Sequence, residues 1–213
     1  MDLSGRLKAI ADVVPKSHKA ADIGTDHGYV PLSLLQDHRI GYAIAADISA
    51  GSLNKAKMLI RQYHMEHCME TRLGGLLICD ILEKDEAVAR TASALVLQPM
   101  TAQAELRRWL VSNRYGIAQE DLAREEQRIY EIIVAVPGLE AAKPDQDIYY
   151  DIGWKLIEER HPLLGEFIRR KIRALEEIVA QLEAGKTASA MARRMELEER
   201  IRLYKEVFHC HIR

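Results

Sequence analysis

A repeated alternation of apolar runs, glycine-containing turns and amphipathic stretches begins at residue 19, and it constrains the fold more than any other feature of the sequence. Short apolar runs that alternate with helical patterns are typical of βα units, whose strands lie side by side in a parallel sheet. We therefore expect an α/β protein. The 213 residues suffice for one larger α/β domain, or for one domain with a modest appendage.

The expected elements follow this alternation along the chain. Strands are predicted from apolar runs at residues 19–24, 41–47, 69–73, 93–99 and 128–138. Helices are predicted from amphipathic patterns at residues 27–37, 49–65 and 102–112, with a further amphipathic stretch over 76–90.

The residues after Pro137 and Gly138 lose the strand pattern and become helical. We expect a domain boundary near residue 140, with an α/β domain over 1–140 and a helical domain over 141–213. The second segment carries apolar residues three or four positions apart, as in a helical seam, at Leu164, Ile168, Ile172, Leu175, Val179 and Leu182, and again at Leu197, Ile201, Tyr204 and Phe208. This spacing predicts a helical hairpin of the coiled-coil type.

Composition excludes several classes of protein. A hydrophobic content of 48% is too high for a disordered chain, and no apolar run reaches the roughly 18 residues that a membrane span needs. The net charge of −2 gives no global attraction to nucleic acid, so such a partner would be held by a local patch. We expect a soluble, cytoplasmic protein with no membrane partner that is a monomer or a weak homodimer.

The cysteines and histidines do not predict a metal site. Cys68, Cys79 and Cys210 form no C-x-x-C pair. His64 and His67 lie near Cys68 with a spacing that suits one helical face, but no second pair of ligands follows. We therefore expect free thiols and no bound metal.

The loops after the first two strands are the candidate ligand site, because ligands of open α/β sheets bind beyond the carboxyl ends of the strands. Gly24 permits close backbone approach, and Thr25 or Asp26 can cap the next helix. Asp47 lies 23 residues beyond Gly24, where a carboxylate accepts both hydroxyls of an adenosine ribose. Ile48 follows it, and Asp22 either holds a cofactor amino group or bonds loop amides.

The glycine pattern narrows the choice of cofactor. No G-x-G-x-x-G run is present to take a pyrophosphate, so an adenosine cofactor without phosphate fits better. D-I-G followed by an acidic end to the second strand is typical of class I S-adenosylmethionine methyltransferases, although a generic doubly wound fold also uses such a turn.

Several strings resemble the bacterial tRNA (adenine(22)-N(1))-methyltransferase family, TrmK: ADIGTDHGYVPL, AIAADISAGSLNKA, LVLQPM, LRRWL, IYEIIVA and the tail from GWKLIEERHPLL. The resemblance covers nearly the whole chain. It implies a Rossmann-like class I methyltransferase sheet with a C-terminal coiled-coil hairpin. It also implies S-adenosyl-L-methionine as the cofactor and N1 of an adenine in tRNA as the methyl acceptor.

A tRNA adenine must be turned out of the folded RNA before its N1 can react. Asp26 and His27, directly after the cofactor loop, are the candidate catalytic pair, in which a carboxylate stabilises the methylated base or takes a proton from N6. The alternative is a helix N-cap followed by a first-turn residue. The adenine pocket is expected to be lined by residues that could equally be packing or turn residues, namely Tyr29, Gln98, Pro99 and Met100.

Basic residues of the helical tail are the candidate tRNA phosphate contacts. The first group is Arg169, Arg170 and Lys171, with Arg173, Arg193 and Arg194 farther along. Many glutamates accompany them, so the alternative is a solvated helix face with charge pairs one turn apart.

The chain departs from the family pattern at Gly74 and Gly75. The family has a linker, a further strand and a Gly-Met-Gly-Gly loop there, whereas the two glycines join the flanking segments directly. That strand would lie beside the first strand in the middle of the sheet, so its loss would expose two strands and destabilise the protein. We therefore expect that residues are missing from the chain at this point. Two alternatives remain, namely an interaction module without catalysis and a small-molecule methyltransferase, for which the helical tail has no obvious use. A genuine loss of the strand would put cofactor binding and activity in doubt and would favour the interaction module.

Overall fold

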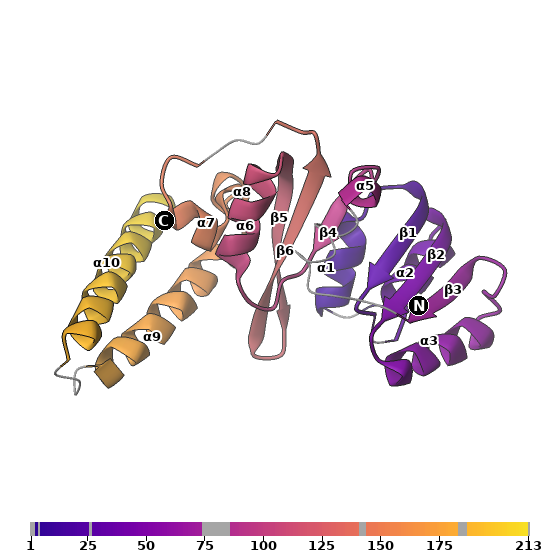
Figure 1. Cartoon of the computed structure of the whole chain (residues 1–213), viewed down its shortest axis with the longest axis horizontal. Coiled ribbons are helices and arrows are strands. Elements are labelled where there is room, and N and C mark those ends of the chain that lie inside the picture. The colour runs from indigo at the N-terminus through magenta and orange to yellow at the C-terminus, as the bar shows by residue number, and fades with distance from the viewer. Residues whose placement is uncertain are drawn as a thin grey trace.

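The computed structural model describes residues 3, 5–25, 27–73, 86–140, 144–182 and 187–212. The molecule is elongated, with an α/β body at one end and two long helices at the other (Figure 1). None of the described helices is both long enough and apolar enough to cross a membrane.

The N-terminal part of the body is a parallel sheet covered by helices. Its elements are, in order, α1 (Gly5–Val13), β1 (Ser17–Ile23), α2 (Tyr29–Gln36), β2 (Ile40–Asp47), α3 (Ala50–Gln62) and β3 (Met69–Leu73). The strand order is β1-β2-β3, and both pairs are parallel. Ala43 and Ala45 of β2 are fully buried against apolar residues of α2 and α3, including Leu32 and Ala56. The predicted βα units are confirmed here, with small shifts at their ends.

The second part of the body contains α5 (Glu86–Ala89), β4 (Leu95–Leu97), α6 (Gln103–Ser112), β5 (Tyr115–Glu125) and β6 (Arg128–Pro137). Its sheet has the order β4-β6-β5, and both pairs are antiparallel. The expectation of a parallel sheet throughout is therefore wrong for this part. Only two residues separate β5 from β6, and so short a connection forces neighbouring strands to run in opposite directions.

Strand β5 was missed by the sequence analysis because its charged residues hide the strand pattern. It nevertheless contributes Tyr115, Ile117 and Leu122 to the buried core. One of its acidic residues, Glu120, is itself buried, where it pairs with Arg107 of α6.

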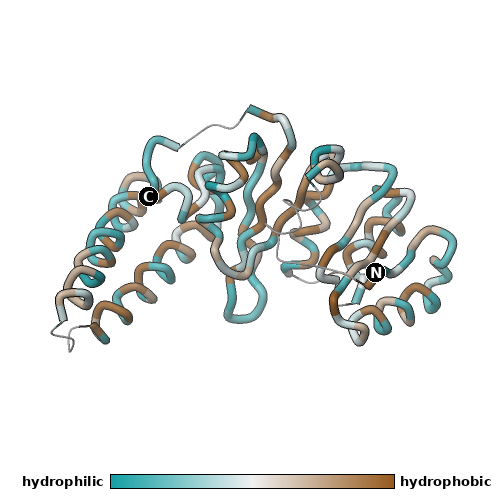
Figure 2. The backbone as a smooth tube through the Cα atoms, viewed as in Figure 1, coloured by the Kyte–Doolittle hydropathy of each residue, from teal (hydrophilic) through white to brown (hydrophobic). Residues whose placement is uncertain are grey.

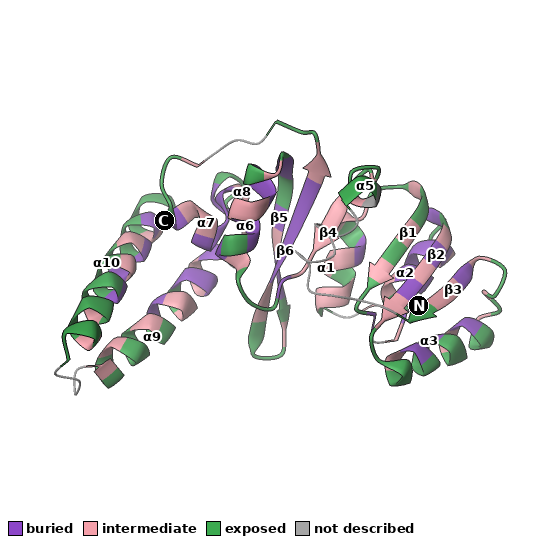
Figure 3. Ribbon diagram, viewed as in Figure 1, coloured by how far each residue is buried: buried purple, intermediate pink, exposed green. Residues whose placement is uncertain are grey.

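Strand β1 and strand β4 are both edges of their sheets among the described residues. None of the seven residues of β1 is buried, whereas the centre of β6 is buried (Figure 3). Among the described residues, no strand pairs with the outer edge of β1 or of β4. The junction at Gly74 and Gly75, where the missing strand was predicted, lies outside the described residues.

Four helices complete the chain: α7 (Ile148–Ile152), α8 (Trp154–Glu158), α9 (Leu164–Leu182) and α10 (Ala188–His211). Helices α9 and α10 pack against each other, and hydrophobic and hydrophilic residues alternate along both (Figure 2). We call this pair the arm. Its predicted seam residues Ile168, Ile172, Ile201 and Tyr204 share one apolar core with Leu122 of β5, so the base of the arm is built onto the second sheet.

Candidate functional site

The loop after β1 is held close to β2 by its backbone. The amides of Gly24 and Thr25 both donate to the carbonyl oxygen of Ala46, at 2.8 and 3.0 Å. Thr25 is buried, and its hydroxyl oxygen accepts a hydrogen bond from the amide of Gly28 at 2.9 Å. Gly24 has a φ of +84°, which only glycine adopts readily, and a Cβ there would meet no described atom within 4 Å. The loop is therefore fixed while the space beside Gly24 stays open to a ligand.

Two carboxylates lie at the carboxyl ends of β1 and β2. Desolvation of the partly buried carboxyl group raises the pKa of Asp22, and the negative charge of Asp47 raises it further, while a hydrogen bond with Thr25 and the charge of Arg6 oppose the shift. Asp47 accepts a hydrogen bond from the amide of Ser49 at 2.6 Å through Oδ1. The structure thus brings together two acids that are expected to bind the polar ends of an adenosine cofactor.

Exposed apolar side chains follow the same strand ends. Ile23 ends β1, Ile48 follows β2 and is 73% exposed, Leu73 ends β3, and Met100 lies shortly after β4. Large exposed apolar side chains at the ends of strands, next to acids, are typical of a ligand site rather than of an ordinary surface. The residues present therefore fit S-adenosylmethionine, with its apolar adenine ring and its polar ribose and amino acid ends.

His27 and Tyr29 form a stacked pair beyond the loop. Their ring centroids are 5.0 Å apart and the rings are inclined by 5°. Gly28 between them has a φ of +78°, a backbone conformation that favours glycine. Tyr29 keeps 36% of its surface exposed, which leaves a ring surface for a base. Asp26, the other member of the predicted catalytic pair, lies outside the described residues.

The predicted pocket residues Gln98, Pro99 and Met100 form the turn after β4. The amide oxygen of Gln98 accepts a hydrogen bond from Nη1 of Arg6 at 2.8 Å. Sequence analysis did not single out Arg6, which also pairs with Glu125 of β5 and whose charge acts on Asp22. Arg6 therefore connects the cofactor loop with the turn after β4. A lone arginine in an amphipathic helix gives no sequence signal of such a role.

The predicted phosphate contacts on α9 point in different directions. The guanidinium of Arg169 lies 5.3 Å from the ring centroid of Phe208, and Arg170 pairs with Glu166 at 2.6 Å and bonds the carbonyl of Gln127. Lys171 instead turns inward, where its Nζ bonds the carbonyl oxygen of Asp151 at 2.9 Å. The structure therefore places Arg169 and Arg170 at the surface of the arm and Lys171 at its base.

The metal prediction concerned His64, His67 and the cysteines. Among the described residues, no group of three or more histidine, cysteine, aspartate or glutamate side chains is placed to hold a metal ion. Cys79 lies outside those residues, and Cys68 and Cys210 are free thiols.

Two family models and a curated relative match this chain. The family model for TrmK, tRNA (adenine(22)-N(1))-methyltransferase, matches residues 68–206, and a general methyltransferase-domain model matches residues 3–77. The tRNA (adenine(22)-N(1))-methyltransferase of Bacillus subtilis is 27% identical over 237 aligned residues, which cover 97% of each chain. That alignment is longer than the 213 residues present here, so the relative carries residues that this chain lacks.

Solved structures of similar chains share the fold. The crystal structure of the B. subtilis M1A22 tRNA methyltransferase TrmK superposes with a TM-score of 0.84 at 26% identity, covering 97% of this chain and 98% of that one. A Streptococcus agalactiae protein of the NADB-Rossmann superfamily gives a TM-score of 0.84 at 27% identity, covering 97% of both chains. The predicted Rossmann-like class I methyltransferase fold is thereby confirmed.

Proposed function

Because the chain belongs to the TrmK family of tRNA (adenine(22)-N(1))-methyltransferases, we propose that it transfers a methyl group from S-adenosyl-L-methionine to N1 of adenine 22 in tRNA. The observation that carries the proposal is the pair of acids, Asp22 and Asp47, at the ends of adjacent parallel strands beside the open loop at Gly24. Such a pair suits a phosphate-free adenosine cofactor.

Each part of the site has a proposed role in holding the cofactor. Asp47 accepts hydrogen bonds from the ribose hydroxyls, and Ile48 contacts the adenine ring. Asp22 and Thr25 hold the amino acid end, which carries a positive amino group that a carboxylate attracts. The raised pKa of Asp22 supports this role, because a positive group beside it would offset the cost of burying the charge.

The protein's own contribution to the reaction is to position the adenine against the cofactor and to exclude water. When bound, the cofactor supplies a methyl group on a positively charged sulfur. Tyr29 and the turn at Gln98, Pro99 and Met100 hold the flipped adenine so that N1 lies roughly 3 Å from the methyl carbon. We propose, from sequence position, that Asp26 and His27 stabilise the cationic product or take its proton.

We further propose that residues 1–140 form the catalytic domain and that the arm is a coiled coil that embraces tRNA. Arg169 and Arg170 support this role as surface cations near the base of the arm. Contacts of this kind bind phosphate without reading the sequence, so tRNA affinity should fall steeply as salt rises.

The test is to incubate the protein with labelled S-adenosylmethionine and unmodified bacterial tRNA and to locate the product by primer extension. Methylation at N1 blocks the pairing edge, so a stop is expected at adenine 22. The stop should disappear with Asp47→Ala, and it should also disappear with a tRNA transcript that carries guanine at position 22.

Two other results would reject the proposal. Cofactor binding without label transfer to tRNA would exclude tRNA as the substrate and favour a small-molecule methyltransferase. Absence of cofactor binding in calorimetry would favour the interaction module. The second result is the one expected if the predicted loss of a strand at Gly74 and Gly75 is genuine and that strand is indispensable.

A further inference from the structure

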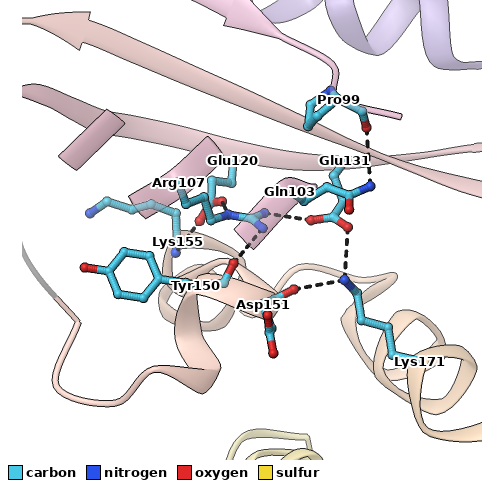
Figure 4. A network of polar contacts seen from close by, with 9 residues as sticks. All are labelled: Pro99, Gln103, Arg107, Glu120, Glu131, Tyr150, Asp151, Lys155 and Lys171. Atoms are coloured by element: carbon cyan, nitrogen blue, oxygen red, sulfur yellow. Dashed lines mark hydrogen bonds and ion pairs between the residues drawn. The ribbon is translucent and has the colours of Figure 1, made fainter. Parts of the chain in front are cut away.

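A buried ionic network joins the base of the arm to the second sheet (Figure 4). Its centre is Arg107 of α6, which is fully buried. Nε of Arg107 donates to Oε1 of Glu120 at 2.6 Å, and Nη2 donates to Oε2 of Glu131 at 2.8 Å. Nη1 donates to the carbonyl oxygen of Tyr150 at 2.9 Å. One guanidinium thus binds both neighbouring strands β5 and β6 and the chain at α7.

The positive and negative charges of this network are equal in number only when Lys171 of the arm is included. Arg107 faces two buried glutamates, which together exceed its single positive charge. Nζ of Lys171, from α9, lies 3.2 Å from Oε1 of Glu131 and supplies the second positive charge. Burial alone lowers the pKa of Arg107, but the two glutamates outweigh it and raise that pKa above its usual value. Since an uncompensated charge in the interior is costly, Lys171 is tied to Arg107 through Glu131.

The backbone around the network is shaped to admit it. Gly153, between α7 and α8, has a φ of +93°, and a Cβ there would lie 2.7 Å from Oε1 of Glu120 and 2.9 Å from Nη2 of Arg107. The amide of Lys155 donates to Oε2 of Glu120 at 3.0 Å. The segment before the arm therefore closes tightly over the ion pairs.

Helix α6 also connects the network to the proposed adenine pocket. Gln103 lies one turn before Arg107 on the same side of α6, and its Nε2 donates to the carbonyl oxygen of Pro99 in a long hydrogen bond of 3.4 Å. Figure 4 shows Gln103 between Pro99 and the buried glutamate Glu131. A shift of Arg107 would therefore be felt at Pro99.

We propose that Lys171 and Arg107 are positioning residues, which transmit the placement of the arm to the turn at Pro99 and so align a tRNA held by the arm with the cofactor. The inference rests on the proposed function for its catalytic consequence. The physical link itself is independent of any substrate. Lys171, which the sequence suggested as a phosphate contact, then acts through Glu131 and not on RNA.

The test uses the full-length chain and four variants. Lys171→Met removes the balancing charge, and the double variant Lys171→Met with Glu131→Gln restores balance between Arg107 and Glu120. Gln103→Leu breaks the other end of the link without touching an ion pair. Lys155→Met is the matched control, because only the backbone amide of Lys155 enters the network, while its side chain pairs with exposed Glu158.

Two readouts are measured, namely amide hydrogen exchange at residues 98–104 and the steady-state kinetics of tRNA methylation. With Lys171→Met, exchange should rise about tenfold and kcat should fall about tenfold, with the KM for tRNA and the Kd for the cofactor unchanged. The double variant should return both within about threefold of the wild type. Gln103→Leu should reproduce the effect at residues 98–104 but leave exchange in α9 unchanged, and the control should behave as the wild type.

Three results would overturn the inference. One is unchanged exchange at residues 98–104 in both Lys171→Met and Gln103→Leu. Another is a rise in KM at constant kcat, which a direct phosphate contact of Lys171 would produce. The third is a double variant no better than Lys171→Met. Should the wild type fail to methylate tRNA while the exchange results hold, the proposed function falls and the physical link stands.

Discussion

The two sheets of the α/β body differ in whether their buried charged groups are paired. Around β1 and β2, Asp22 is buried enough to raise its pKa, and apolar side chains such as Ile48 are left exposed. Around β5 and β6, the buried charges of Arg107, Glu120 and Glu131 are paired at hydrogen-bond distance. The first region carries an electrostatic cost that a ligand would relieve, whereas the buried charges of the second region are already paired with one another.

This difference distinguishes a binding region from a structural framework. A charged group with a strongly shifted pKa next to exposed apolar surface is typical of a functional site. A network of buried charges that are all paired is typical of a joint, that is, a place where secondary-structure elements are held together. Substitutions in the second region should therefore change the free energy of unfolding more than the affinity for the cofactor, and substitutions in the first region should do the reverse.

The largest effect is expected from Arg107→Met. The variant leaves Glu120 and Glu131 buried without their main partner, and breaking a buried pair in this way costs about 3–5 kcal/mol in the free energy of unfolding. Arg108→Met is the matched control, because Arg108 is the next residue along α6 and pairs with Asp147 at the surface. That substitution should cost about 1 kcal/mol or less. Urea denaturation of both variants measures the difference, and equal losses would contradict the view of the network as a joint.

A smaller loss is expected from Gly153→Ala. The new methyl group would meet Glu120 and Arg107 and would also force alanine into a positive φ, for a combined cost of about 2–3 kcal/mol. Gly138→Ala carries only the second penalty, since a Cβ on Gly138 meets no described atom within 4 Å, and should cost about 1 kcal/mol. The difference between the two unfolding free energies isolates the contact with the ion pairs. No difference would mean that the network yields to the added atom.

These residues also mark where sequence reasoning succeeds and where it stops. Periodicity located the βα units and the seam of the arm, because those patterns arise from burial of apolar faces. It missed β5, since Glu120 occupies a buried position that a strand pattern assigns to an apolar residue. The sequence also suggested Lys171 as a phosphate contact, because a sequence cannot show that Glu131, forty residues earlier, needs a positive partner. Pairing of distant buried charges is a property of the tertiary structure.

In the cofactor region we expect Asp22→Asn to separate affinity from stability. The pKa of Asp22 is raised in the native state, so ionisation favours unfolding as the pH rises from about 3.9, the ordinary pKa of aspartate, to the raised native value. The neutral asparagine removes this loss. At pH 7 the cofactor-free variant should therefore be more stable by about 1 kcal/mol, while its affinity for S-adenosylmethionine falls roughly 10- to 100-fold.

Thermal denaturation between pH 3 and pH 8 measures the stability difference, and calorimetry measures the affinity. The advantage of the variant should vanish below about pH 3.9, where the carboxyl group is protonated in both states of the wild type. Asp12→Asn, at an exposed aspartate of α1 that pairs with Lys8, is the control and should change neither quantity. A variant that is less stable at every pH would show that Asp22 supports the loop and does not await a ligand.

The smallest effect on stability is expected on the outer face of the arm. Arg193 donates two hydrogen bonds to Glu196, at 2.8 and 2.7 Å, but both side chains are more than half exposed. Exposed pairs of this kind contribute little, so Arg193→Gln should change the free energy of unfolding by less than about 0.5 kcal/mol. If the arm binds phosphate, the same variant should lower the slope of log affinity for tRNA against log salt by about 1. Glu196→Gln frees Arg193 from its partner and should therefore tighten tRNA binding at low salt. If Arg193→Gln leaves the slope unchanged and Glu196→Gln leaves the affinity unchanged, this face of the arm contacts solvent and not tRNA.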